Sequence, residues 1–205
     1  MKIAVINEVS ACPRNADVVA AIKKQGHEVL NLGMSDPAQT PSITYLHTGL
    51  MSALAIHLGI CDFVVGGCGT GIGYLNSVLQ YPGMTCGLIL EPLDAWLYTR
   101  INDGNCISLA LNKGYGWAAN LNLEMIFANL FPAEKEGGYP ANRAESQTES
   151  RNKLKKISED THFSMVEIVK KLDKELVKTA MSFAPFAEAV KNAPESELKS
   201  LLLTF

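Results

Sequence analysis

The chain has 205 residues, of which 47% are hydrophobic and 19% charged, with a net charge of -3 and an isoelectric point of about 5.8. This length and composition are typical of one globular domain, or of one domain with an appendage, and they exclude global disorder. The charge balance argues against nucleic acid as a partner, and no apolar run approaches the roughly 20 residues that span a bilayer.

Two features of the sequence, the N-terminus and the cysteines, indicate the cellular location of the protein. The first residues, MKIAVINEV, are expected to form a strand rather than a signal peptide, because the apolar part is short and no cleavage site follows. The five cysteines are an odd number and are widely spaced, which predicts reduced thiols in a cytoplasmic protein.

Strands and helices are predicted to alternate as far as Pro132. The expected strands are Lys2–Ile6, Glu28–Leu32, Asp62–Gly66, Met84–Leu90 and Asn105–Leu111. The expected helices are Asn15–Gln25, Thr44–Leu58, a third from Gly71–Gly73 to Leu79, Leu93–Arg100, and a fifth from Gly114 to Phe131. This alternation predicts a doubly wound, five-stranded parallel sheet covered on both faces, a Rossmann-like three-layer sandwich.

Beyond Pro132 the composition changes. Residues 133–150 are polar and contain glycine, so we expect an extended arm or linker after an α/β domain of residues 1–132. Residues 151–205 are helical in pattern, with breaks at Pro185 and Pro194 and a last short helix at Ser196–Leu203. The segment is small for an independent domain, so we expect a helical extension that packs on the first domain or on a partner subunit.

The stretch VVGGCGTGIGYLN, from Val64 to Asn76, has five glycines in eight residues around Cys68. A P-loop requires lysine after the glycines, but Tyr74 and Leu75 stand there, and a dinucleotide fingerprint requires glycine where Tyr74 is found. A zinc site requires clustered ligands, and no Cys-x-x-Cys is present. A tight turn with an inert buried cysteine remains open.

The alternative interpretation is catalytic. Glycines leave backbone N–H groups accessible to ligand oxygens, and the positive potential at the start of a helix favours a thiolate over a thiol. One loop then supplies both a base and donors for a developing oxyanion. These are the requirements of proton abstraction next to a carbonyl, as in the enediolate route of aldose–ketose isomerases.

Three motifs in order resemble the ribose-5-phosphate isomerase B and galactose-6-phosphate isomerase family: GGCGTGIG, INDGN at Ile101–Asn105 and EGGYPANR at Glu136–Arg143. The resemblance covers about residues 1–143, and the rest is similar to longer members with a C-terminal helical extension. It implies an isomerase without metal or other cofactor that works as a homodimer, or a dimer of dimers, with a shared site. Nucleic acid and membrane are not expected partners.

The resemblance also implies site residues. It makes Cys68 the proton shuttle, assisted by Thr70, and gives the anion-binding loop as Gly69, Thr70, Gly71, Ile72 and Gly73. It implies substrate contacts by Asn7, Glu8, Tyr45 and Asn102, and a phosphate contact by Arg143 from the partner subunit.

Several positions depart from the family pattern. Val9 and Ile101 stand where the family has histidines, the second of which opens the sugar ring, and Tyr139 and approximately Asn112 stand at arginine positions. Arg14, Lys113 and Arg100 are candidate replacements for the arginines. We therefore expect a short or otherwise acyclic sugar phosphate, or one whose ring opens unaided. The competing hypothesis is a sugar-phosphate-binding protein without catalysis.

Overall fold

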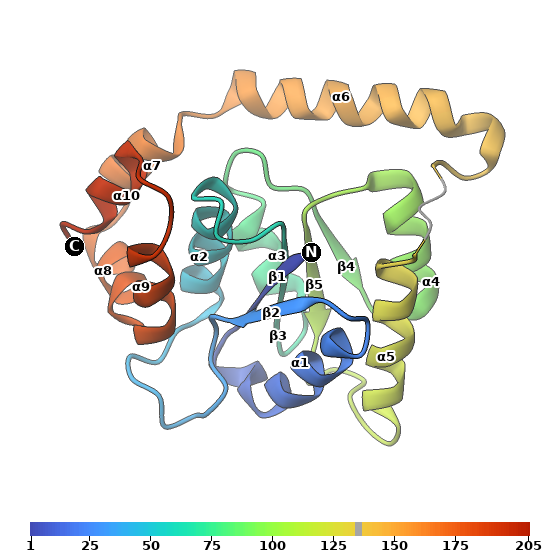
Figure 1. Ribbon diagram of the computed structural model, residues 1–205, viewed down its shortest axis with the longest axis horizontal. Helices are drawn as coiled ribbons and strands as arrows, with labels where there is room; N and C mark the ends of the chain where they lie inside the picture. Colours follow the sequence, from blue (N-terminus) through green and yellow to red (C-terminus); the bar gives the residue numbers. More distant parts are fainter. Residues whose placement is uncertain (134–136) are drawn as a thin grey trace.

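The computed structural model describes residues 1–133 and 137–205, and its centre is a five-stranded parallel sheet (Figure 1). The strands are β1 (Lys2–Asn7), β2 (Glu28–Asn31), β3 (Phe63–Cys68), β4 (Cys86–Ile89) and β5 (Cys106–Ala110). Their order in the sheet is β2-β1-β3-β5-β4. The predicted doubly wound α/β fold is therefore confirmed.

Helices cover both faces of the sheet. They are α1 (Asn15–Lys23), α2 (Tyr45–His57), α3 (Ile72–Val78), α4 (Pro92–Leu97) and α5 (Ala119–Leu130). Alternate strand residues supply two separate apolar cores, because successive side chains of a strand point to opposite faces. Ala4, Ile6 and Val64 pack with α2 and α3, whereas Ile3 and Val5 pack with α1 and α5.

Two predicted boundaries differ from the structure for clear backbone reasons. Strand β3 continues through Gly67 to Cys68, because the glycines allow close packing. A Cβ on Gly66 would lie 2.0 Å from Cζ of Tyr74. Helix α5 begins at Ala119 instead of Gly114, because Gly114 and Ala118 have positive φ angles of 73° and 61°, which a right-handed helix cannot contain.

The predicted arm of residues 133–150 becomes helical before its expected end. Helix α6 (Ala144–Thr161) begins there and crosses the molecule on the side of the loops that precede β4 and β5 (Figure 1). Four short helices follow: α7 (Met165–Lys171), α8 (Lys174–Ser182), α9 (Ala184–Lys191) and α10 (Glu197–Leu202). Glu136, which begins the Glu-Gly-Gly motif, lies outside the described residues.

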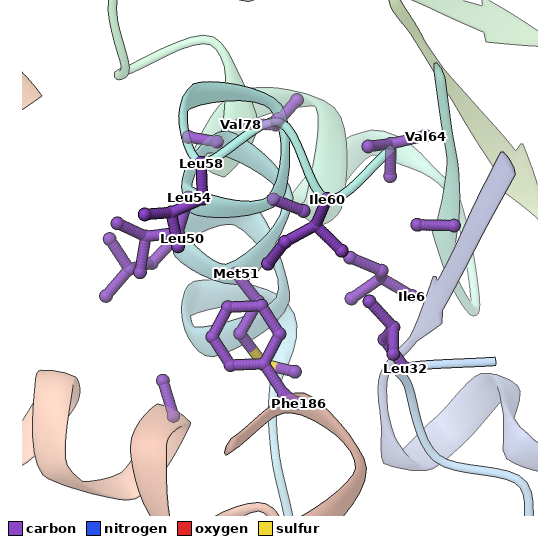
Figure 2. Close-up of a cluster of buried hydrophobic side chains, with 14 of the residues drawn as sticks. Ile6, Leu32, Leu50, Met51, Leu54, Leu58, Ile60, Val64, Val78 and Phe186 are labelled. Carbon is purple, nitrogen blue, oxygen red and sulfur yellow. The ribbon is translucent and has the colours of Figure 1, made fainter. Parts of the chain in front are cut away.

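The C-terminal helices complete the core on the α2 side. Phe186 of α9 is fully buried and points toward Met51 of α2, beside Leu50 and Leu54 (Figure 2). The expected extension is thus confirmed as helical and packed on the first 132 residues, although the division into domains stays a prediction. Among the described residues, no helix is both long and apolar enough to cross a membrane.

Candidate active site

Cys68 and Glu8 lie at the point where the winding of the sheet changes direction. The chain runs from β1 outward to β2, then returns to place β3 on the other side of β1. Cys68 is the last residue of β3, and Glu8 directly follows β1. In open parallel sheets, ligands bind beyond the carboxyl ends of the strands at such a switch point. The topology therefore places the glycine-rich loop where a ligand site is expected.

The loop between β3 and α3 depends on Gly71. Its φ of 77° is left-handed, and a Cβ there would lie 2.6 Å from Cδ1 of Leu88, so a side chain meets both strain and a clash. The Ser108 hydroxyl holds the turn by donating to the Gly71 carbonyl at 2.6 Å. The first amides of α3, which follow Gly71, have no carbonyl within their own helix to donate to. The turn thus aims N–H groups of the loop away from the helix.

Cys68 is 5% exposed, and its sulfur lies 3.9 Å from the hydroxyl of Thr70, which is exposed. The Thr70 hydroxyl in turn accepts the Ile72 N–H at 3.4 Å. Ile72 itself projects outward with 48% of its surface exposed.

A hydrogen-bonded network around Ser10 joins the loop after β1 to the loop after β3. Glu8 is buried and accepts both the N–H and the hydroxyl of Ser10, the former at 3.1 Å. The Ser10 hydroxyl also accepts the Gly69 N–H at 3.1 Å, and Asn112 donates to the Ser10 carbonyl at 2.8 Å. The Gly69 amide is consequently engaged within the protein.

Sequence reasoning missed Ser10. A serine two residues after a glutamate predicts a local turn, because serine hydroxyls bond to nearby backbone. Nothing in the pattern links Ser10 to Gly69, which is 59 residues away along the chain.

Tyr45 lies beside the loop, whereas Asn7 faces the other side of the sheet. A Cβ on Gly73 would lie 3.2 Å from the Tyr45 ring, so this ring borders the predicted anion-binding loop. Asn7 alternates with Ile3 and Val5 toward the α1 side, and neither polar atom of its fully buried side chain has a hydrogen-bond partner among the described residues. A substrate contact by Asn7 stays a prediction.

Tyr45 also borders an apolar cavity of about 480 Å³, and no glycine of the loop is among its lining residues. Its walls come from α3, from the start of α2 and from the junction of α6 with α7 and α8, including His162, Phe163 and Leu172. Cys68 does not line this cavity. The C-terminal extension therefore forms one wall of this cavity, and the Tyr45 ring lies between the cavity and the glycine-rich loop.

The remaining predicted residues lie near the amino ends of the strands, on the side of the sheet opposite to Cys68. Cys68 pairs with Ala110 at the carboxyl end of β5, about 13 Å along that strand from Cys106 at its start. Asn102 is exposed and precedes β5, on a π-helical turn, η2 (Tyr98–Asn102). Within one chain, Asn102 therefore does not meet Cys68.

Arg143 lies with Asn102 rather than with Cys68. It is exposed at the start of α6, with its Nε 3.3 Å from the Ser146 hydroxyl. The preceding arm reaches η2, because the Gly138 N–H donates to the Arg100 carbonyl at 3.0 Å.

The three candidate replacement cations lie at different ends of the strands. Arg14 stacks on Tyr115 at 4.4 Å, and the Lys113 N–H donates to the Gly69 carbonyl at 2.9 Å, so both lie near the carboxyl ends of the strands, as Cys68 does. Arg100 stacks on Trp96 at 3.9 Å, on the turn that carries Asn102. Of these three candidates, Arg14 and Lys113 are thus the two that lie on the same side of the sheet as the glycine-rich loop of their own chain.

Comparison with known proteins places the chain close to sugar isomerases. Residues 3–146 match the family model described as Ribose/Galactose Isomerase. The chain is 29% identical over 133 residues to the ribose-5-phosphate isomerase B of Escherichia coli K12, a match that spans 64% of this chain and 84% of that protein.

Two solved structures are similar over the whole chain. A ribose-5-phosphate isomerase from Vibrio parahaemolyticus has a TM-score of 0.94 and 38% identity, covering 100% of this chain and 98% of that one. A 4-deoxy-L-threo-5-hexosulose-uronate ketol-isomerase complexed with a tartrate has a TM-score of 0.93 and 34% identity, covering 100% of both chains. The similarity therefore includes helices α7 to α10, which lie beyond the last residue matched by the family model.

Proposed function

Because this chain belongs to the Ribose/Galactose Isomerase family, and is therefore an isomerase, we propose that it interconverts an aldose and a ketose of a small sugar phosphate through an enediolate, with Cys68 as the acid/base group. The observation that carries the proposal is the position of Cys68 at the end of β3, beside Thr70 and the loop turned by Gly71.

The proposed chemistry divides between the sulfur and the loop. The Cys68 thiolate removes a proton from the carbon next to the substrate carbonyl and returns it to the former carbonyl carbon. The hydroxyl proton moves to the oxygen of the former carbonyl in the same sequence, so that the carbonyl and the hydroxyl exchange positions. Negative charge develops on the carbonyl oxygen during this step. Amides of Gly71 and Gly73 stabilise that charge, since the Gly69 amide is engaged by Ser10 and the Ile72 amide by Thr70.

Solvent-deuterium exchange tests the chemistry. Incubation in heavy water should place deuterium on the carbon next to the carbonyl, because a proton held by a cysteine exchanges with solvent between the two transfers. A protein that only binds sugar phosphates would incorporate none. Absence of exchange with every ketose phosphate and uronate offered would overturn the proposal.

We further propose a homodimer whose active sites are shared. Asn102 and Arg143 lie near the amino ends of the strands, whereas Cys68 lies at the carboxyl end of β3. They therefore reach only the Cys68 thiol of a second copy of the chain. Mixing Cys68→Ala chains with Asn102→Ala chains should then recover about a quarter of wild-type sites, because each mixed dimer has one intact site. No recovery after subunit exchange would contradict the shared site.

The five free cysteines suit the reducing cytoplasm, where we propose that the enzyme works.

A second candidate substrate is an acyclic uronate, and Ile101 is the observation that favours it. An isoleucine cannot transfer the proton that opens a sugar ring. The substrate in the name of the ketol-isomerase relative, 4-deoxy-L-threo-5-hexosulose uronate, has a carbonyl at C5 and no hydroxyl at C4. It therefore lacks the hydroxyls that close ordinary sugar rings. A single carboxylate also requires fewer cations than a phosphate, which suits a site with Tyr139 and Asn112 at the arginine positions.

A direct comparison of ribose 5-phosphate with 4-deoxy-L-threo-5-hexosulose uronate separates the two candidates. The larger kcat/KM identifies the substrate class. Ile101→His should raise kcat for ribose 5-phosphate and leave kcat for the uronate unchanged if the missing ring-opening group limits the reaction. A wild-type enzyme that already prefers ribose 5-phosphate would refute the uronate candidate.

A further inference from the structure

The turn η2 has an irregular backbone and carries Asn102 as its last residue. π-Helical turns are rare and occur frequently at functional sites. Asp103, which follows, has a φ of 48°, a conformation that residues other than glycine seldom adopt, and its N–H donates to the Tyr98 carbonyl at 2.9 Å.

The first part of the turn is anchored to the body of the α/β domain. The Tyr98 hydroxyl lies 2.7 Å from the carbonyls of both Thr85 and Cys106, and the Thr99 hydroxyl donates to the Leu130 carbonyl at 3.0 Å. These contacts fix where the turn begins. They leave the position of its last peptide unit, next to Asn102, to be set by other groups.

Arg151 of α6 supplies that contact. Its Nη1 donates to the Ile101 carbonyl at 3.0 Å, and its Nη2 donates to the Thr148 hydroxyl at 2.8 Å, so the guanidinium is itself oriented by its own helix. The Ile101 carbonyl and the Asn102 N–H belong to one planar peptide unit. A charge-assisted hydrogen bond to this carbonyl therefore fixes the plane from which the Asn102 side chain departs.

We propose that Arg151 is a positioning residue for the reaction: it holds the Ile101–Asn102 peptide so that Asn102 meets the substrate hydroxyls. This inference rests on the substrate contact of Asn102 in the proposed function. It assigns to α6 a role in catalysis besides any role in assembly. A misplacement of about 1 Å in a positioning group is enough to cost about a hundredfold in rate.

A double-mutant cycle tests the proposal with ribose 5-phosphate and with the uronate. Arg151→Ala and Asn102→Ala should each lower kcat/KM, by up to about a hundredfold, and the double variant should be no worse than Asn102→Ala alone. Arg151→Lys should recover part of the loss, because lysine keeps a charged donor. Lys153→Ala is the control, since it removes a cation about 200° around the same helix and should leave kcat/KM unchanged.

Amide hydrogen exchange gives a second readout that needs no turnover. The Asp103 amide, which closes the turn, should exchange faster in Arg151→Ala than in the wild type or in Lys153→Ala. Unchanged exchange, or losses that add fully in the double variant, would overturn the inference. If Asn102→Ala were fully active, the assigned substrate contact of Asn102 would fail and the inference with it. If only Arg151→Ala were fully active, the inference alone would fail.

Discussion

The thiols of this chain have different surroundings. Burial raises the pKa of the Cys61 thiol to about 12 and also raises the pKa of Cys86. Cys68 instead ends a strand beside the Thr70 hydroxyl. Cys68→Ala should therefore lower turnover at least about a hundredfold, the contribution of a lost acid/base group. Initial-rate assays should show Cys61→Ala retaining turnover, and equal losses in both variants would assign the effect to folding.

Gly66 is a residue whose missing side chain shapes the site. A Cβ there would lie 2.0 Å from Cζ of Tyr74, whose hydroxyl is held by Ser52 at 2.7 Å, so the ring cannot move aside freely. Gly66→Ala should lower the free energy of unfolding by about 3 kcal/mol, the upper part of the range for overpacked cores. Urea denaturation measures this. Gly116→Ala, where a Cβ meets nothing within 4 Å, should change stability by less than about 0.5 kcal/mol.

At the scale of one element, helix α2 begins with a cap that depends on a neutral histidine. The Nδ1 of His47 accepts the Thr44 N–H at 3.0 Å, and burial lowers the pKa of His47 below its ordinary value of 6.5. The folded state thus binds this proton less readily than the unfolded state. The contribution to stability is complete above pH 6.5 and decreases as the pH falls below that value toward the folded pKa.

Replacing His47 tests this cap. His47→Ala should cost about 1 kcal/mol at neutral pH, whereas His47→Gln should keep the cap and remove its titration. Urea denaturation at about pH 8 and about pH 5 checks both statements. A wild-type protein that loses no more stability than His47→Gln between these values would contradict the assignment.

At the scale of the whole molecule, the C-terminal helices pack into the hydrophobic core on the α2 side of the sheet. Phe186 is fully buried against α2, whereas Phe163 at the cavity rim is 57% exposed. Phe186→Ala should therefore cost about 3–5 kcal/mol, as for other fully buried aromatic side chains. Phe163→Ala should cost less than about 0.5 kcal/mol. Thermal unfolding in a single transition, shifted for Phe186→Ala alone, is the expected result, and two separate transitions would indicate that the helices fold independently.

The sequence by itself determined the five-stranded parallel sheet, the helical C-terminus and the family. Apolar runs separated by amphipathic helices have few alternatives, and the Cys-Gly-Thr-Gly-Ile-Gly motif is local, so adjacent residues carry its meaning. The pattern ended the third strand at Gly66 and placed Cys68 in the turn after it, whereas in the structure Cys68 is the last residue of that strand. The start of α5 did not follow from the pattern either, because the left-handed Ala118 has no sequence signal of its own.

Only the tertiary structure decided which of the candidate residues meet. Ser10 and Gly69 are 59 residues apart, and Arg151 and Ile101 are 50 apart, yet each pair forms a hydrogen bond. The structure also separated Asn102 from Cys68, because one precedes β5 and the other ends β3 on a parallel sheet. Local spacing determines strands and loops, but contacts between distant segments depend on the packing of the whole chain, which no short motif contains.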